Sequence, residues 1–250
     1  MTSFTTPFDV NKSISSLNDR YGQSQLDTFR ECRPFQDWYT EFQSDPNNEK
    51  YSLEKVILTD LDMFGPRVGF CKFTAVIKEK KTGIHLPGIT VLRGPSVAIL
   101  VIINCSDNPH LPKKVLLTKQ FRTPVAKEVI EVPAGMLDTS NNICSKALEE
   151  LKEETGINVG VDDLVNLTER SGMSKGILMS PGLLDERIHL FSTKIDLTES
   201  QIKQLEKEER GEKDEGEIIH LTTIDLDKAH TIPDAKILSL LLLNQIYNGQ

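Results

Sequence analysis

Residues 135–157, with the sequence GMLDTSNNICSKALEELKEETGI, decide the expected fold. In the middle of this stretch apolar residues recur at the three- and four-residue spacing of an amphipathic helix, and Gly156 is a typical helix stop. We therefore predict a helix over residues 140–155. Its apolar face should pack on a core, so acidic residues at the border of that face would lie at the wall of a site.

The second half of the predicted helix is crowded with acidic residues, namely Glu149, Glu150, Glu153 and Glu154. At about 100° per residue, the last three share an arc of about 100°. Like charges at these spacings destabilise an isolated helix by about 0.2–0.5 kcal/mol per pair, so we expect a positive charge to lie on them. Mg²⁺ is the natural candidate because it takes oxygen ligands while keeping waters and substrate phosphates. A solvated acidic helix surface is the alternative, and it explains the same carboxylates without a metal.

This stretch resembles the Nudix box, G-x5-E-x7-R-E-U-x-E-E-x-G-U, in which U is an aliphatic residue. Seven of its nine specified positions match at unbroken spacing between Gly135 and Ile157. The two departures are Asn141, where the box has Glu, and Glu149, where it has Arg. Unbroken spacing over the whole box makes the resemblance specific despite these departures.

Similarity to the ADP-sugar diphosphatase branch of this family extends beyond the box. It rests on residues 119–122 (KQFR), 131–136 (EVPAGM), 180–182 (SPG), 185–187 (DER) and 215–217 (EGE). Upstream, residues 62–70 (DMFGPRVGF) and 93–95 (RGP) are similar to plant-type ADP-glucose diphosphatases. The resemblance covers the chain from about residue 53 to the C-terminus. It implies a Nudix α/β/α sandwich with a mixed sheet, preceded by an N-terminal antiparallel sheet.

The resemblance also implies a metal site and a catalytic group. In the family, Mg²⁺, for which Mn²⁺ can substitute, is bound through a backbone carbonyl at the position of Ala134 and through carboxylates at those of Glu150, Glu153 and Glu154. Glu217, or alternatively Glu215, matches an acidic loop residue that helps to bind metal or activates the attacking water. The implied catalytic residues are therefore Glu217, Glu215 and Glu154.

Four further residues match substrate positions of the family. Arg93 and Arg122 correspond to positions near the diphosphate or the sugar, and Met136 and Glu186 correspond to positions in the substrate pocket. The guanidinium of Arg122 can clamp a phosphate through its planar fork of donors. A solvated charge run is the alternative interpretation of the acidic loop around Glu215 and Glu217.

The exchange of the box Arg for Glu149 is the departure with the largest expected consequence. In the family this Arg would hold a neighbouring catalytic Glu in place, and loss of such a partner typically costs about 10- to 100-fold in metal affinity or activity. Lys146 or Lys152 could substitute electrostatically, although Lys is a point charge and not a fork. Asn141 removes a further carboxylate without deleting the three main ligands.

The rest of the chain divides into three predicted regions. Residues 1–50 are a polar extension with one amphipathic helix, marked by aromatic residues from Phe35 to Phe42. Residues 51–92 form an N-terminal β region that, by the resemblance, can mediate a homodimer, and residues 93–250 form the Nudix domain. In that domain we expect strands at 97–103, 115–121, 128–132, 188–195 and 218–224, and helices at 199–210 and 234–247. Strands interleaved with helices indicate an α/β or α+β layered domain.

Composition narrows the classes of partner and compartment. The 250 residues include 29 Lys plus Arg against 37 Asp plus Glu, a net charge of −8, which is the wrong sign for binding nucleic acid or an anionic membrane surface. The four cysteines, Cys32, Cys71, Cys105 and Cys144, are scattered without a C-x-x-C motif, so neither a zinc site nor a disulfide framework is indicated. A reducing compartment, and therefore a cytoplasmic protein, is expected. No apolar run is long enough to span a bilayer.

Three functional hypotheses follow from the sequence. The first is an enzyme that uses Mg²⁺ to hydrolyse the diphosphate of an ADP-sugar, ADP-glucose or ADP-ribose, to AMP and a sugar phosphate. The second is a catalytically weakened Nudix domain that binds a nucleotide sugar or serves as a scaffold. The third is an acidic α/β protein whose glutamate cluster is only surface.

Overall fold

The chain folds into two compact units. The computed structural model describes residues 9–10, 12–137, 142–211 and 216–248. The first unit comprises Met1–Gly94 with Ser180–Glu186, and the second comprises Pro95–Met179 with Arg187–Gln250. The division falls at the Arg93-Gly94-Pro95 stretch, and the first unit also takes in a short loop from the second half of the chain.

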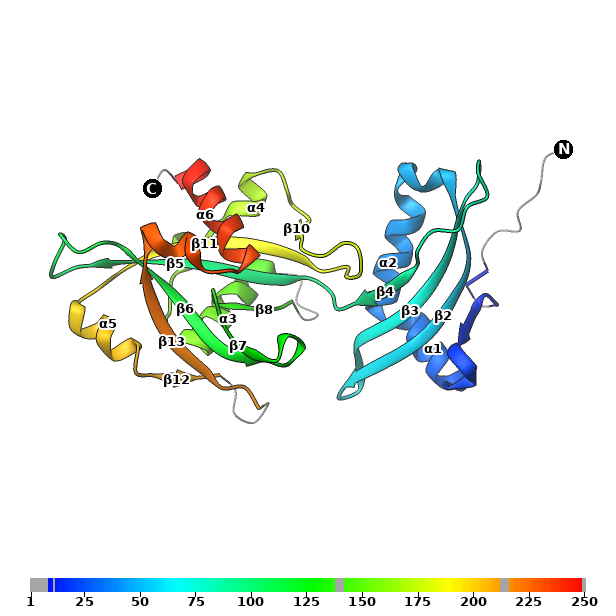
Figure 1. Ribbon diagram of the computed structural model, residues 1–250, viewed down its shortest axis with the longest axis horizontal. Coiled ribbons are helices and arrows are strands. Elements are labelled where there is room, and N and C mark those ends of the chain that lie inside the picture. The colour runs from blue at the N-terminus through cyan, green and yellow to red at the C-terminus, as the bar shows by residue number, and fades with distance from the viewer. Residues whose placement is uncertain (1–8, 11, 138–141, 212–215, 249–250) are drawn as a thin grey trace. The chain divides into compact units, whose positions relative to one another are not determined.

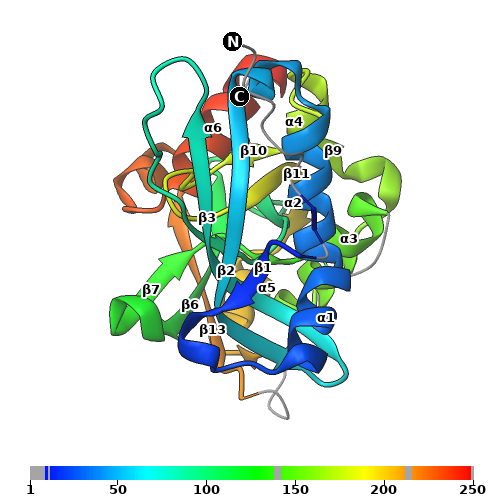
Figure 2. The same cartoon turned by 90° about the vertical axis from the view of Figure 1, so that its right-hand side faces the viewer.

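The first unit is a sheet covered by two helices (Figure 2). Its elements are β1 (Ile14–Ser16), α1 (Gln23–Glu31), α2 (Arg33–Ser44), β2 (Tyr51–Phe64), β3 (Arg67–Glu79) and β4 (Ile89–Leu92), with 3-10 turns at Leu17–Asp19 and Pro46–Lys50. The strand order is β1-β2-β3-β4; β1 runs parallel to β2, and the other neighbours are antiparallel. The predicted antiparallel sheet is thus present.

Aromatic side chains join the helices to this sheet. The rings of Phe29 on α1 and Phe35 on α2 are fully buried, and their centroids lie 4.5 Å apart. Phe73 of β3 lies beneath them, 5.6 Å from Phe29. Helix α2 is the predicted amphipathic helix, whereas α1 was not predicted because Leu26 and Phe29 are the only large apolar residues in an otherwise polar segment.

The second unit is built on a mixed sheet (Figure 1). Its strands are β5 (Ser96–Cys105), β6 (Lys114–Arg122), β7 (Lys127–Glu131), β8 (Ala134–Met136), β9 (Val165–Asn166), β10 (Ile177–Leu178), β11 (Arg187–Leu197), β12 (Glu209–Arg210) and β13 (Ile219–Asp225). The order is β10-β11-β5-β6-β13-β12, with β7 on β6, β8 on β5 and β9 on β11. Strands β5 and β11 are parallel and the other pairs are antiparallel.

Helices cover both faces of this sheet, because the central strand β5 is apolar on both sides. They are α3 (Ile143–Thr155), α4 (Leu167–Arg170), α5 (Glu199–Leu205) and α6 (Ala235–Asn248), with 3-10 turns at Thr123–Val125, Val161–Asp163 and Leu226–Thr231. Val97, Ile99 and Val101 pack with α3 and α5, while Ala98 and Leu100, pointing the other way, pack with α4 and α6 (Figure 1). The predicted α/β/α sandwich with a mixed sheet is confirmed.

One predicted helix is too long. The helix expected over residues 199–210 ends at Leu205, and Glu209 and Arg210 instead pair with His220 and Ile219 of β13. Residues 206–210 are all charged, so they offer no apolar side chain to bury on a helix face.

Asn141, Glu215 and the predicted start of the box helix lie outside the described residues. Within the described residues, no helix combines the length and the apolar character that a bilayer crossing needs.

Candidate active site

Helix α3 carries the acidic residues of the box. It begins after Asn142, whose side chain accepts a hydrogen bond from the Ser145 amide at 3.0 Å, and ends at Gly156, which has a φ of +74°. The left-handed conformation at Gly156 is one that side chains rarely adopt, and a Cβ there would also lie 2.6 Å from the Arg210 guanidinium. Burial of the opposite, apolar face then sets the rotation of the helix, and this rotation turns Glu150 and Glu154 toward β8.

The end of β8 receives these two carboxylates. A Cβ on residue 135 would lie 1.9 Å from the carboxyl carbon of Glu150, so any larger residue would displace that carboxylate from its present position. The Ala134 amide donates a hydrogen bond to Glu154 Oε2 at 3.0 Å. The glycine that opens the box and the residue before it therefore form a cradle for Glu150 and Glu154.

The charges of these carboxylates are poorly compensated. Glu154 is 4% exposed, and burial raises its pKa well above the usual value, with the Glu150 and Glu217 carboxylates adding to the rise and the Ala134 amide and Arg122 opposing it. Burial also raises the pKa of Glu150; the Lys146 ammonium opposes this effect, and the Glu153 and Glu217 carboxylates add to it. Three carboxylates from α3 and one from the loop before β13 thus repel one another.

Lys146 forms ion pairs with two of the acidic residues of this helix. Its Nζ lies 3.0 Å from Glu150 Oε1 and 3.2 Å from Glu149 Oε2. Burial would lower the pKa of Lys146, but the two carboxylates outweigh burial and raise it. Of the two lysines considered from the sequence, the structure places Lys146 on Glu150.

The side chains present fit a hard divalent cation. The described residues hold no ready-made cluster of three acidic, histidine or cysteine side chains at metal-binding distance. The donors are nevertheless carboxylate oxygens, which suit Mg²⁺ or Mn²⁺, and the raised pKa values of Glu150 and Glu154 show that more positive charge would be favourable there. Glu153 is exposed on the same side of the helix, so it remains accessible to a hydrated ion.

Arg122, at the end of β6, is held by an acidic residue that the sequence analysis did not single out. Arg122 Nε lies 2.6 Å from Glu131 Oε2, and Lys236 Nζ of α6 lies 2.6 Å from Glu131 Oε1. Asp234 lies 3.1 Å from the same Lys236 Nζ. In the sequence, Glu131 belongs to the 131–136 stretch that resembles the family. That stretch does not reveal its partner on α6, Lys236.

A hollow of about 350 Å³ opens beside Glu217. It is lined by Gln120, Phe121, Thr123, Gly216, Glu217 and Ile218. Gln120 is 7% exposed, and its Nε2 has no hydrogen-bond partner within the described structure. An unsatisfied buried donor is rare and costs free energy, so Gln120 is a candidate ligand-binding residue that the sequence analysis missed.

Two of the predicted substrate residues meet in the first unit. Arg93 Nη1 lies 3.0 Å from Glu186 Oε1, and Asp185 accepts a hydrogen bond from the Arg93 amide at 2.8 Å. Arg93 Nε is buried and has no hydrogen-bond partner among the described residues. Met136 belongs to the second unit, where it is the last residue of β8 and half-buried.

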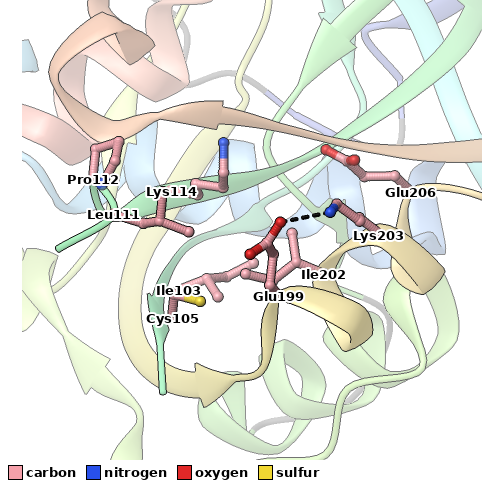
Figure 3. A pocket seen from close by; sticks show the side chains of 9 residues that line it. All are labelled: Ile103, Cys105, Leu111, Pro112, Lys114, Glu199, Ile202, Lys203 and Glu206. Carbon is pink, nitrogen blue, oxygen red and sulfur yellow. Dashed lines mark hydrogen bonds and ion pairs between the residues drawn. The ribbon is translucent and has the colours of Figure 1, made fainter. Parts of the chain in front are cut away.

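A smaller hollow of about 200 Å³ lies elsewhere in the second unit (Figure 3). It is lined by Ile103, Cys105, Leu111, Pro112, Lys114, Glu199, Ile202, Lys203 and Glu206. The ion pair between Glu199 and Lys203 borders it. None of the described residues that line it is a predicted site residue.

Together, the α/β/α sandwich and the acidic helix packed on a Gly-containing strand end define a Nudix-type domain. The NUDIX domain family matches residues 92–241. The chain therefore belongs to the Nudix hydrolase family.

The chain is similar in sequence to two named hydrolases and in fold to a third. The chain is 35% identical over 211 residues to Nudix hydrolase 14, chloroplastic, of Arabidopsis thaliana, covering 82% of this chain and 67% of that protein. It is 30% identical over 145 residues to the ADP-ribose pyrophosphatase of Saccharomyces cerevisiae, covering 56% of this chain and 53% of that protein. A crystal structure of an ADP compounds hydrolase has a TM-score of 0.52 and 15% identity, covering 80% of this chain and 94% of that chain, and it shows likeness of fold.

Proposed function

We propose that this Nudix hydrolase uses Mg²⁺, or Mn²⁺ in its place, to cleave the diphosphate of an ADP-sugar, ADP-glucose or ADP-ribose, to AMP and a sugar phosphate. The observation that carries the proposal is the half-buried Glu150 and the buried Glu154 on the Gly135 strand end, whose negative charge the surrounding protein neutralises only in part. The relative named ADP-ribose pyrophosphatase supports the class of substrate.

The metal ligands would be Glu150, Glu153, Glu154 and Glu217 with the backbone of Ala134. A divalent cation bound there would neutralise phosphate charge and lower the pKa of a bound water. The protein holds Glu154 ready through the Ala134 amide, and the missing side chain at Gly135 leaves room for Glu150. These contacts fix the carboxylates before substrate arrives, which is what a preorganised site requires.

Other side chains would bind the diphosphate and move the proton. Arg122, held in place by Glu131, would clamp a phosphate oxygen, and the unsatisfied Gln120 amide would donate a second hydrogen bond. Glu217, at the border of the hollow, would accept the proton of the attacking water. Met136 would contact the rest of the nucleotide sugar, and a substrate-binding role of Arg93 and Glu186 stays a prediction.

The rival function is a weakened Nudix domain that binds a nucleotide sugar without efficient turnover. The ion pair between Lys146 and Glu150 favours it, because an internal ammonium competes with an added cation for the same carboxylate. A point charge also orients a carboxylate less firmly than a guanidinium does.

One experiment separates these functions. AMP release from ADP-glucose and from ADP-ribose is measured with Mg²⁺, with Mn²⁺ and with EDTA, for the wild type, for Glu154→Gln and for Glu149→Gln. The proposal predicts metal-dependent release that is lost in Glu154→Gln and kept in Glu149→Gln, an exposed glutamate on the same helix. Thermal stabilisation by the ligand without AMP release would favour the binding protein instead. The absence of both AMP release and thermal stabilisation would contradict both functions.

The homodimer and the cytoplasmic location stay predictions. We propose that the homodimer forms through the first unit, where Met63 and Phe64 at the β2–β3 turn are 46% and 37% exposed. Light scattering of the purified chain gives its mass in solution directly. A mass of one chain at micromolar concentration would contradict the dimer.

A further inference from the structure

An ion-pair network, here called the α6 network, consists of Arg122, Glu131, Lys236 and Asp234. Arg122 at the end of β6 donates a hydrogen bond from Nε to Glu131 Oε2 at 2.6 Å. The other oxygen of Glu131, Oε1, accepts from Lys236 Nζ, also at 2.6 Å. Lys236 Nζ in turn lies 3.1 Å from Asp234 Oδ1. The Glu131 carboxylate therefore joins two cations, and α6 supplies the second of them.

The α6 network is buried at one end and open at the other. The side chains of Glu131, Asp234 and Lys236 are 10%, 8% and 14% exposed, whereas the side chain of Arg122 is 38% exposed. Water and salt screen buried ion pairs much less than exposed ones, so the three buried side chains restrain one another strongly. An anionic ligand can therefore reach the Arg122 end, while the rest of the network is shielded from it.

Lys236 holds the centre of the α6 network. Burial would raise the pKa of Glu131, but the two cations outweigh burial and lower it, and Lys236 contributes more to this lowering than Arg122 does. Asp234 fixes Lys236 at two points, because its Oδ1 also accepts a hydrogen bond from the Lys236 amide at 3.0 Å. The ammonium is thus tied to the first turn of α6 on one side and to Glu131 on the other.

The position of Lys236 limits how Glu131 can bind Arg122. A carboxylate and a guanidinium can pair through two parallel hydrogen bonds. Because Lys236 engages Oε1, Glu131 accepts from Arg122 Nε through Oε2, and this arrangement keeps the two terminal guanidinium nitrogens available to another anion. Without Lys236, both oxygens of Glu131 would be open to Arg122, and two-point pairing would occupy a terminal nitrogen.

We propose that Lys236 is a positioning residue that, through Glu131, keeps the guanidinium of Arg122 open to the diphosphate of the substrate. Asp234 shares this role because it fixes the ammonium from the side opposite Glu131. The inference rests on the proposed function, in which Arg122 clamps a phosphate oxygen. It adds two residues of the α6 end of the domain that act on the substrate without touching it.

The test is a double-mutant cycle on AMP release from ADP-ribose and ADP-glucose at saturating Mg²⁺. The proteins are the wild type, Lys236→Met, Arg122→Ala and the double variant, each checked by circular dichroism at the assay temperature. Lys236→Met should raise KM at least about 10-fold in the wild-type background and change it less than about 2-fold in Arg122→Ala, because the guanidinium through which it acts is gone. The value of kcat should change little, since a contact made in both the ground state and the transition state alters KM.

A matched control separates positioning from a merely structural role. Lys228→Met makes the same exchange at an ammonium that is 63% exposed and pairs with Asp225, and it should leave KM unchanged in both backgrounds. The positioning role is overturned if Lys236→Met leaves KM unchanged, or if it raises KM equally with and without Arg122. Either result would leave the proposed function standing, because the wild type would still release AMP.

A second variant serves if Lys236→Met does not fold. Asp234 Oδ2 is buried and makes no hydrogen bond within the described residues, so Asp234→Asn can keep Oδ1 as the acceptor while removing the charge that fixes Lys236. It should raise KM by about 3-fold, again only in the presence of Arg122. An equal rise in Arg122→Ala would contradict the proposal.

A binding measurement distinguishes failure of this inference from failure of the proposed function. If the wild type releases no AMP, the proposed function fails, and the same cycle is measured as the Kd for ADP-ribose in Mg²⁺ by calorimetry. A rise in Kd for Lys236→Met that disappears in Arg122→Ala would support the positioning role, and equal rises would overturn it. A wild type that neither releases AMP nor binds ADP-ribose would overturn both.

Discussion

Glu131 and Glu154 are two buried glutamates of the same domain with opposite electrostatics. Glu131 is 8% exposed and Glu154 is 4% exposed, so burial penalises both charges. At Glu131 the effect of burial is outweighed by Lys236 and Arg122, and its pKa is lowered; at Glu154 burial dominates and its pKa is raised. A buried carboxylate with its own cations stabilises the fold, whereas one without them marks a place where a cation from solution would bind.

The largest expected effect comes from neutralising the poorly compensated site. Glu154→Gln and Glu150→Gln should each lower Mg²⁺-dependent turnover at least about 1,000-fold, equivalent to roughly 4 kcal/mol of barrier, because each removes a metal ligand. Steady-state AMP release at saturating Mg²⁺ measures this.

The stability of Glu154→Gln also tests the difference between Glu154 and Glu131. In EDTA, Glu154→Gln should unfold at the same or a higher urea concentration than the wild type, because it removes a buried charge while its amide oxygen can still accept from the Ala134 amide. A clear loss of stability would mean that Glu154 is a structural carboxylate like Glu131.

Neutralising the compensated site should act on stability. Glu131→Gln leaves Arg122 and Lys236 without their shared carboxylate, and it should lower the free energy of unfolding by about 3 kcal/mol. Urea unfolding at neutral pH measures the change. Glu128→Gln on the same strand is the matched control, since the Glu128 to Lys119 ion pair is solvent-exposed and should contribute little. Equal effects of the two variants would contradict the structural role of Glu131.

Lowering the pH should gradually remove the contribution of Glu131 to the free energy of unfolding. Because its pKa is lowered in the folded protein, its stabilising contribution is fully present above the unfolded pKa of about 4.3. That contribution is lost as the pH falls through the folded pKa. The difference in unfolding free energy between the wild type and Glu131→Gln should therefore be constant near neutrality and shrink below about pH 4.3. A difference that grows on acidification would contradict the assigned direction.

The sequence predicted the parts of the fold that depend on local pattern. The apolar run at residues 97–103 predicted a strand, and it is present as β5, whose residues face two apolar cores. The position of Glu150 and Glu154 at the border of a buried helix face also followed from helical spacing. Each of these features is set by residues close together in the chain.

The missed features depend on residues far apart in the chain. Glu131 meets Lys236 across 105 positions, and no local pattern links them. Gln120 became a candidate only because its buried Nε2 lacks a partner, which a linear sequence does not reveal.

The smallest expected effect tests whether Lys146 already performs the task of the box arginine. Glu149 is exposed and lies 3.2 Å from Lys146, so Glu149→Arg should free Lys146 to pair with Glu150 alone while adding a second cation beside it. We expect kcat/KM for AMP release to stay unchanged or to rise by up to about 10-fold, the lower end of what an orienting partner contributes. Glu149→Gln, which removes the charge without adding one, should change it less. A fall in kcat/KM for Glu149→Arg without a fall for Glu149→Gln would show that the new cation competes with Mg²⁺ for Glu150. Lys146 alone would then already supply all the positive charge that Glu150 needs from the protein.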